Sequence, residues 1–241
     1  MIFVLLPCYN ESQNLPALVR ELDEVLDDYQ AVAVNDGSTD ETRSVLEDLE
    51  VNYCVHILQH SVNLGLQAAL LTGLDYILET ASADDVLVTM DADGTQDPRD
   101  IPALVSHIKQ GATVAIGSRY VDGGRQENVT LSRQIMSRGI NTLLRVRTRI
   151  PVADQTSGFR AFDITALRVA RKQFHPDFIE ATGFAVSAEL LVKTWYASER
   201  KYVEEVPILL DYGKKQGTSG LHLTETIADY LRLLGRVPHW Q

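Results

Sequence analysis

Several common site motifs are missing from this 241-residue chain, and each absence excludes a class of protein. No Gly-x-Gly-x-x-Gly follows the first apolar segment, which argues against a dinucleotide-dependent dehydrogenase. The phosphate-binding loop Gly-x-x-x-x-Gly-Lys-Ser/Thr is absent, as is the Gly-x-Ser-x-Gly of serine hydrolases. The six histidines are scattered along the chain. No group of His and Cys has the spacing of a zinc site.

Cysteine and long apolar runs are also scarce. Cys8 and Cys54 are the only cysteines, so a disulfide framework is excluded and a reducing cytosol is expected. No apolar stretch approaches the roughly 20 residues that cross a bilayer. The apolar run at 2–6 lacks the basic start of a signal peptide, and Pro7 ends it early. We therefore expect a cytoplasmic protein that lies, at most, on the cytoplasmic face of a membrane.

Positive charge is in deficit overall but is concentrated in one segment. The formal net charge is −11, which argues against general nucleic-acid binding. Residues 119–160 contain eight arginines and three acidic residues, a net charge of +5, so the rest of the chain carries −16. Such a run is usually a solvated helix face. Every cation here is an arginine, however, and arginine suits bidentate binding of phosphate.

Predicted strands and helices alternate through the first 120 residues. Apolar runs predict buried strands at 2–6, 31–34, 53–58, 86–90 and 113–117, and helical spacing fills the intervals. One helix is expected to begin at a capping box formed by Ser38 and Glu41. This order predicts an α/β fold with a Rossmann-like, mostly parallel sheet and helices on both faces. Since no linker interrupts the chain, we expect a single domain, 1–241, with a nucleotide-binding half (1–120) and an acceptor-side half (121–241).

The pattern is looser after residue 120. Helices are expected at 132–146, 165–172, 185–197 and 223–234, a strand at 203–210, and a loop or short strand at 151–162. The helix at 223–234 is amphipathic. Its few basic residues favour packing in the core over anchoring in a membrane.

Polar clusters follow each of the first five predicted strands. In parallel α/β sheets, ligands bind beyond the carboxyl ends of the strands. Five polar strand ends on one rim therefore predict a binding site. The clusters are Pro7-Cys8-Tyr9-Asn10-Glu11, Asn35-Asp36-Gly37-Ser38, Asn63-Leu64-Gly65, Asp91-Ala92-Asp93 and Gly117-Ser118-Arg119-Tyr120.

Asp91-Ala92-Asp93 is the most informative of these clusters. Two carboxylates two residues apart on an extended backbone point to the same side. A hard divalent cation, Mg²⁺ or Mn²⁺, relieves their repulsion and can itself carry phosphates. An acidic turn at a strand end is the alternative. Taken with the other clusters, the pair predicts a nucleotide diphosphate held through a metal ion.

In this order, the motifs resemble those of family 2 glycosyltransferases with the GT-A fold, from about residue 2 to about residue 210. The segment from Arg133 through Ser137 to Asn141, followed by Asp154 and Thr156-Ser157-Gly158-Phe159-Arg160, is similar to the dolichol-phosphate mannose synthase branch. The resemblance implies metal-dependent, inverting transfer of a hexose, mannose or glucose, from GDP-mannose or a UDP-hexose to a polyprenyl or dolichyl phosphate. A membrane surface and a membrane-anchoring partner are further expected partners.

The resemblance also implies residue roles. Asp91 and Asp93 would bind Mg²⁺ or Mn²⁺, and Ala92 would lie beside the nucleotide. Gly158 and Phe159 would shape the loop near the sugar. The nucleoside would be held by Pro7, Tyr9, Asn10, Glu11 and Asp36, and the acceptor phosphate by Arg119, Arg133 and Ser137, with Arg138 assisting or facing solvent. From the residues alone, Asp36 is equally suited to a turn, Tyr9 to packing, and Glu11 to a helix N-terminus.

Three positions depart from the family pattern. Asn35 stands where the family usually has Asp. Thr95 replaces a metal-binding Gln of some relatives, so Thr95, Gln96 or water would complete the metal shell. The stretch at 217–220 lacks the lysine of Gly-x-Ser-Lys, which Lys214 or Lys215 could replace.

Two other functions remain open. Transfer to a sugar or protein hydroxyl would need a general base, for which Asp154 is the candidate. A phosphate acceptor is already anionic and needs none, which would explain an arginine-rich segment without a catalytic histidine. The third possibility is a non-catalytic subunit that binds nucleotide sugars.

Overall fold

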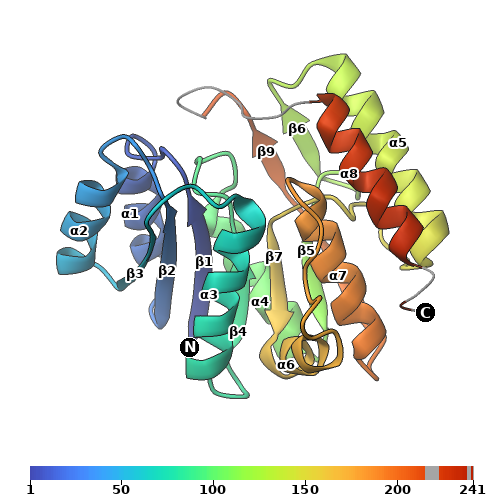
Figure 1. The fold of residues 1–241 in the computed structure, drawn as a ribbon, viewed down its shortest axis with the longest axis horizontal. Helices are drawn as coiled ribbons and strands as arrows, with labels where there is room; N and C mark the ends of the chain where they lie inside the picture. Colours follow the sequence, from blue (N-terminus) through green and yellow to red (C-terminus); the bar gives the residue numbers. More distant parts are fainter. Residues whose placement is uncertain (215–222, 238–239, 241) are drawn as a thin grey trace.

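The computed structural model describes residues 1–214, 223–237 and 240. Within these residues, seven strands form a central sheet and two form a small one (Figure 1). The strands are β1 (Ile2–Cys8), β2 (Tyr29–Asp36), β3 (Val55–His60), β4 (Val86–Thr89), β5 (Val114–Ser118), β6 (Arg125–Glu127), β7 (Arg160–Asp163), β8 (Val203–Pro207) and β9 (Leu209–Asp211). The helices are α1 (Leu15–Val25), α2 (Thr42–Asn52), α3 (Leu66–Thr80), α4 (Ile101–Lys109), α5 (Leu131–Thr148), α6 (Ile164–Gln173), α7 (Ala185–Ala197) and α8 (Leu223–Arg236), and a 3₁₀ turn, η1 (Pro98–Asp100), precedes α4.

The central sheet has the order β3-β2-β1-β4-β7-β5-β8. Its neighbouring strands are parallel except at β7, which runs antiparallel to both β4 and β5. The expected mostly parallel α/β sheet is therefore confirmed. Because β7 lies between β4 and β5, the strands that lead to Asp91 and Arg119 are not neighbours.

Helices cover both faces of the sheet because the inner strands are apolar on both sides. Phe3 and Leu5 of β1 pack in a core shared with α3, α6 and α7. Val4 and Leu6 point to the opposite face and pack with α1 and α4. This alternation is the two-residue period of an extended strand.

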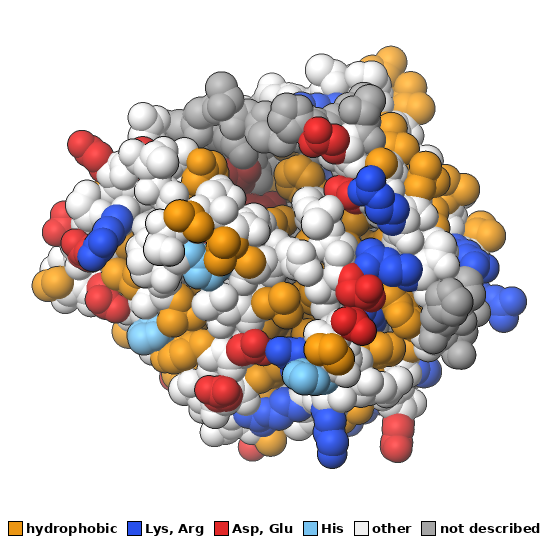
Figure 2. Space-filling view, in the orientation of Figure 1, with side chains coloured by type: hydrophobic (Ala, Val, Ile, Leu, Met, Phe, Trp, Pro, Cys, Tyr) orange, Lys and Arg blue, Asp and Glu red, His pale blue; other side chains and the backbone are white. Residues whose placement is uncertain are grey.

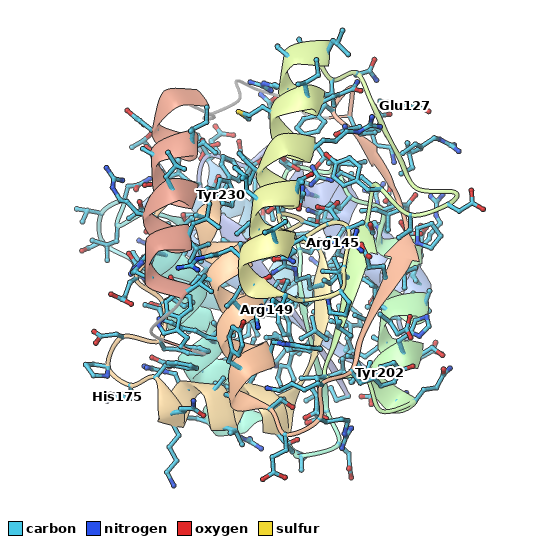
Figure 3. The ribbon with its side chains drawn as sticks, turned by 90° about the vertical axis from the view of Figure 1, so that its right-hand side faces the viewer. Glu127, Arg145, Arg149, His175, Tyr202 and Tyr230 are labelled. Carbon is cyan, nitrogen blue, oxygen red and sulfur yellow. The ribbon has the colours of Figure 1, made fainter. Side chains whose placement is uncertain are left out.

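Helices α5 and α8 run side by side at one edge of the molecule (Figures 1 and 3). The Nε of Arg147 on α5 donates a hydrogen bond to the carbonyl oxygen of Leu234 on α8, at 3.2 Å. Tyr230 and Leu233 of α8 are buried, so the expected core packing of this helix is confirmed for that side. No helix among the described residues is both long and apolar enough to span a bilayer.

Two details of the sequence prediction are wrong. Ser38 does not cap a helix: its Oγ accepts a hydrogen bond from the Asn10 amide, and α2 begins at Thr42. The expected strand at 203–210 is two strands in different sheets, because β8 pairs with β5 whereas β9 pairs with β6. Strand β6 itself was not predicted, since its three residues, Arg125–Glu127, carry no apolar pattern.

Candidate active site

A cleft of about 680 Å³ opens beyond the carboxyl ends of β1, β2, β4 and β5. The polar clusters come together here because parallel strands present their carboxyl ends at one edge of the sheet. All eleven side chains expected at the site line this cleft. They are Pro7, Tyr9, Asn10, Glu11, Asp36, Asp91, Ala92, Asp93, Arg119, Arg133 and Ser137.

Asp91 and Asp93, called the metal corner below, lie in a turn and not on a strand. β4 ends at Thr89, so the extended geometry that we expected is wrong, although both carboxylates still face the cleft. Gln96 holds Asp91 from two sides: its Oε1 accepts from the Asp91 amide at 3.0 Å, and its Nε2 donates to Asp91 Oδ2 at 2.8 Å. The Thr95 hydroxyl donates to Asp93 Oδ1 at 2.7 Å.

The donor set of the metal corner suits a hard divalent cation that keeps other oxygen ligands. Among the described residues, no group of three or more His, Cys, Asp or Glu side chains could enclose a metal ion. Mg²⁺ and Mn²⁺ are commonly bound through one or two carboxylates, with phosphate and water oxygens completing the shell. Thr95 and Gln96 orient the carboxylates through hydrogen bonds.

Asp36 lies at the end of β2 and lines the cleft. It is almost fully buried, and its Oδ1 lies 2.6 Å from Nδ1 of His60. Its carboxylate also accepts from the amides of Leu64 and Gly65, at 2.9 and 2.7 Å. Asp36 therefore fixes the loop at 63–65, which lines the same end of the cleft.

Gly37 allows that loop to approach the end of β2. Its φ is +62°, and a Cβ at this position would lie 2.2 Å from the carbonyl carbon of Val62. Only glycine fits such a close backbone approach. Asn35, the departure from the family pattern, is buried beside it and bonds to Gln59 and to the Ser38 amide, outside the cleft lining.

The segment after β1 also lines this end of the cleft and is joined to the residues that follow β2. Asn10 has a φ of +58°, and its Oδ1 accepts from the Thr39 amide at 2.8 Å. Glu11 accepts from the Asn14 side chain at 2.6 Å, at the start of α1. Tyr9 is 45% exposed, so its ring is available to a ligand.

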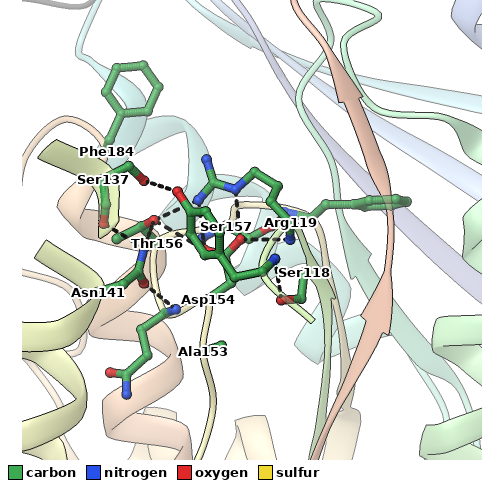
Figure 4. Close-up of polar contacts among 12 residues, drawn as sticks. Ser118, Arg119, Ser137, Asn141, Ala153, Asp154, Thr156, Ser157 and Phe184 are labelled. Carbon is green, nitrogen blue, oxygen red and sulfur yellow. Dashed lines mark hydrogen bonds and ion pairs between the residues drawn. The ribbon is translucent and has the colours of Figure 1, made fainter. Parts of the chain in front are cut away.

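Arg119 and Asp154 form a buried ion pair beside the cleft (Figure 4). The guanidinium binds the carboxylate through Nε and Nη2, each at 2.7 Å, and Asp154 is fully buried. Burial acts to raise the pKa of Asp154, but the charge and hydrogen bonds of Arg119 outweigh it and lower that pKa. Asp154 does not line the cleft. A buried carboxylate committed in this way is poorly placed to act as a general base.

A hydrogen-bond network joins this pair to α5 (Figure 4). Arg119 Nη2 donates to Thr156 Oγ1 at 2.8 Å, and the Asn141 side chain of α5 donates to the same oxygen at 3.0 Å. One turn earlier on α5, the Ser137 hydroxyl accepts from the Tyr120 hydroxyl at 2.8 Å. The network sets the position of α5 relative to the end of β5.

Arg133 of α5 lines the cleft and makes no hydrogen bond or ion pair with the residues that the structure describes. Among the described residues, no carboxylate pairs with Arg133, whereas Asp154 neutralises the charge of Arg119. Arg133 and Ser137, called the acceptor end below, face the cleft from the same helix. Arg138 is exposed, with its guanidinium 5.8 Å from the ring centre of Tyr120.

Several cleft residues were not found from the sequence. Tyr212 follows β9 and interacts electrostatically with both the metal corner and the arginines. Burial is the largest cause that raises its pKa. The polar run Asp211-Tyr212-Gly213 at a strand end was the available signal. Other lining residues that sequence reasoning missed are Leu66, Met136, Ile140, Phe184, Ser187, Leu210, Thr226 and Tyr230.

Gly158 lines the cleft, whereas Phe159 is fully buried in the core and supports the loop from beneath. Arg160 is buried, and burial lowers its pKa to about 10. Lys214 is exposed, with Nζ 4.0 Å from Asp97 Oδ2. Lys215 and the stretch at 217–220 lie outside the described residues.

Comparisons with known proteins agree with this geometry. The model of "Glycosyl transferase family 2" matches residues 3–170. Dolichol-phosphate mannosyltransferase of Pyrococcus furiosus is 33% identical over 100% of this chain, which spans 64% of that relative's length. Polyprenol monophosphomannose synthase of Mycolicibacterium smegmatis is 33% identical over 85% of this chain and 75% of its own length.

A likeness of fold extends to more distant proteins. Glucosyl-3-phosphoglycerate synthase from Mycobacterium tuberculosis, crystallised with Mn²⁺, UDP and glucosyl-3-phosphoglycerate, superposes with a TM-score of 0.69. It is 18% identical, and the match covers 100% of this chain and 79% of that one. This likeness confirms the GT-A fold. The family match and the two sequence relatives show that the chain belongs to glycosyl transferase family 2, in its dolichol-phosphate mannosyltransferase-like branch.

Proposed function

We propose that the protein transfers a hexose, mannose or glucose, with inversion, from a nucleotide sugar (GDP-mannose or a UDP-hexose) to a polyprenyl phosphate. The observation that carries this proposal is Arg133, a cleft-lining cation with no counter-ion among the described residues. An arginine in this setting is suited to binding an anionic group, and a phosphate matches its donor geometry. The similarity to the Pyrococcus and Mycolicibacterium enzymes supports the same acceptor class.

The chemistry requires positioning and charge stabilisation more than proton transfer. An oxygen of the acceptor phosphate attacks the anomeric carbon, the bond from that carbon to the diphosphate breaks, and the electron pair leaves with the nucleoside diphosphate. Arg133 and Ser137 would hold the acceptor phosphate for in-line attack. Arg119, held by Asp154, would contribute from the β5 side. Tyr9, Asn10, Glu11 and Asp36, with Pro7 and Ala92, would hold the nucleotide.

A divalent cation, Mg²⁺ or Mn²⁺, fits the metal corner. When bound to Asp91 and Asp93, it supplies charge that stabilises the departing diphosphate. The structural relatives crystallised with Mn²⁺ or Mg²⁺ support this assignment.

A hydroxyl acceptor is less well supported. It requires a base, and the sequence candidate for that base, Asp154, is buried, ion-paired and absent from the cleft lining. An ionised phosphate acceptor needs no such group. The burial of Asp154 and its ion pair with Arg119 therefore favour a lipid phosphate as the acceptor.

A polyprenyl phosphate resides in a membrane, and the α5–α8 surface suits contact with one. This surface consists of the exposed apolar side chains Leu131, Ile135, Leu143 and Val146 of α5 and Ile227 and Leu231 of α8. α5 contains four arginines and no acidic residue, and Arg149 follows it. Figure 2 shows apolar side chains gathered along this edge, and Figure 3 shows Arg145 on α5 and Arg149 just after its end.

We propose that the α5–α8 surface binds the anionic cytoplasmic face of a membrane, because it combines apolar and basic side chains while the chain as a whole is acidic. Vesicle flotation tests this assignment with a matched pair of variants. Val146 on α5 and Val51 on α2 are 75% and 83% exposed. Val146→Asp is expected to weaken binding to anionic vesicles, whereas Val51→Asp leaves it unchanged. Equal binding by both variants would exclude this surface.

The transfer itself is tested with labelled GDP-mannose, UDP-glucose and UDP-N-acetylglucosamine, Mn²⁺ and a short-chain polyprenyl phosphate, with products identified by mass. Turnover also separates an enzyme from a non-catalytic binder. Arg133→Ala is expected to lower kcat/KM for the acceptor by roughly 10- to 150-fold, the loss of one charged hydrogen bond of about 1.5–3 kcal/mol. The KM for the donor should stay within about threefold.

Arg43→Ala is the matched control, because Arg43 lies on the exposed face of α2 and pairs only with Glu47 among the described residues. The proposal fails if the wild type binds donor but forms no lipid-linked sugar with any of the three donors. It also fails if Arg133→Ala and Arg43→Ala behave alike.

A further inference from the structure

Tyr212 follows β9 and lines the cleft. It lies next to the turn that carries the metal corner, because the Asp211 amide donates to the carbonyl oxygen of Thr95; this position is called the junction below. Its phenol interacts electrostatically with Asp91 and Asp93 and with Arg119 and Arg133. Among the described residues, nothing accepts a hydrogen bond from its hydroxyl. The charged groups that act on the Tyr212 hydroxyl are therefore the two acids of the metal corner and the two arginines.

The backbone around Tyr212 is held in place from three directions. The Asp211 amide donates to the carbonyl oxygen of Thr95 at 3.1 Å, which ties it to the turn that carries the metal corner. The Tyr212 amide donates to the carbonyl oxygen of Glu127 on β6 at 3.3 Å. Asp211 Oδ1 accepts from the Gly213 amide at 2.9 Å and from the Asn128 side chain at 2.6 Å. The backbone that carries Tyr212 is therefore held beside the metal corner before any ligand binds.

A hydroxyl group on a backbone held at the junction can donate a hydrogen bond to a bound phosphate. During transfer, negative charge grows on the departing diphosphate and is withdrawn from the acceptor phosphate, and both groups must lie between the metal corner and Arg133. A preorganised donor aimed at oxygens whose charge changes stabilises the transition state.

We propose, on the basis of the function proposed above, that Tyr212 is a catalytic residue: its hydroxyl donates a hydrogen bond to a phosphate oxygen between the metal corner and Arg133. The phosphate belongs either to the leaving diphosphate or to the acceptor. The two sources share the same chemistry and differ in which reaction the hydroxyl assists.

Tyr212→Phe removes the hydroxyl and keeps the ring. We expect kcat for transfer to the polyprenyl phosphate to fall about 10- to 150-fold, the effect of losing one hydrogen bond to a charged group. The urea unfolding midpoint should stay at the wild-type value. Hydrolysis of the donor sugar without acceptor assigns the phosphate: it slows equally if the bond is to the diphosphate and is unchanged if the bond is to the acceptor.

Tyr76→Phe is the matched control, because Tyr76 lies on α3 outside the cleft, stacked on His56 at 4.3 Å, and should leave kcat within about twofold of the wild type. A kcat and both KM values within that range for Tyr212→Phe would overturn the inference. So would a loss of kcat that accompanies a lower unfolding midpoint, since the hydroxyl would then serve the fold. A wild type without transfer activity would instead overturn the proposed function.

Discussion

Asp154→Asn is the variant whose consequences follow most directly from the structure. It keeps the size of the side chain but removes the charge that faces Arg119 in a fully buried site. The side chains of Arg119 and Asp154 are 9% and 0% exposed. Breaking a buried pair by removing one partner leaves an uncompensated charge, which costs about 3–5 kcal/mol. With a urea m-value of about 3 kcal/mol/M, the unfolding midpoint should fall by about 1 to 1.7 M.

The assay is urea denaturation followed by the fluorescence of the two tryptophans, Trp195 and Trp240. Asp75→Asn is the matched control, because Asp75 pairs with Arg171 at 2.8 Å but is 48% exposed. Exposed ion pairs contribute about 1 kcal/mol or less. The control should therefore shift the midpoint by less than about 0.3 M.

The pH dependence checks the cause of the effect. The folded pKa of Asp154 lies below its ordinary value of 3.8, so the stabilising contribution of the carboxylate is present above that value and is lost as the pH falls below it. The deficit of Asp154→Asn should therefore be constant from about pH 8 to pH 5. Equal midpoints for the wild type and Asp154→Asn would refute the reasoning. So would a variant of wild-type stability that binds donor but has lost only the chemical step, the result expected of a general base.

Three further variants follow from local geometry. Gly37→Ala should lower the free energy of unfolding by at least about 2 kcal/mol in urea denaturation, because the new Cβ would lie 2.2 Å from the Val62 carbonyl carbon at a φ of +62°; a loss below about 0.5 kcal/mol would contradict the close approach. Asp100→Asn should stabilise the protein by about 1 kcal/mol at neutral pH, discounted for partial exposure, because burial and then Asp97 raise the pKa of Asp100 to about 6. The wild type therefore loses stability as the pH rises from about 4 to 6, and the gain should vanish near pH 4. Thr95→Val removes the hydroxyl that orients Asp93 and should weaken Mn²⁺ binding about tenfold in calorimetry with GDP or UDP present; unchanged affinity would exclude the metal corner as the binding site.

The fold was predictable wherever apolar runs and helical spacing coincide with buried elements. The strands at 2–6 and 31–34 are short by a few residues only, because Pro7 interrupts the apolar run of β1 and the polar residues Asn35 and Asp36 end β2. For β7 the sequence allowed a loop or a short strand at 151–162, because Arg160 and Asp163 flank just two apolar residues. Its place in the sheet depends on contacts between distant segments, which local patterns do not report.

The site was predictable to the extent that it lies at strand ends. The clusters after β1, β2, β4 and β5 gather in one cleft, as that rule requires. The partner of Arg119 was not predictable, because Asp154 is 35 residues away and reaches it only through the fold. Tyr212 was missed for the same reason: it is brought to the metal corner by β9, which joins the short sheet with β6.

The central position of β7 has a consequence for how the protein is made. Residues 160–163 fill the gap between β4 and β5, so a nascent chain that has emerged only to residue 120 has both strands but nothing to join them. The nucleotide-binding segments can condense early around β1, β2 and β3, which need only nearby neighbours. Catalytic competence must wait until the later strand inserts. A ribosome that stalls before then would release a product in which one edge of β4 and both edges of β5 are unpaired and open to aggregation.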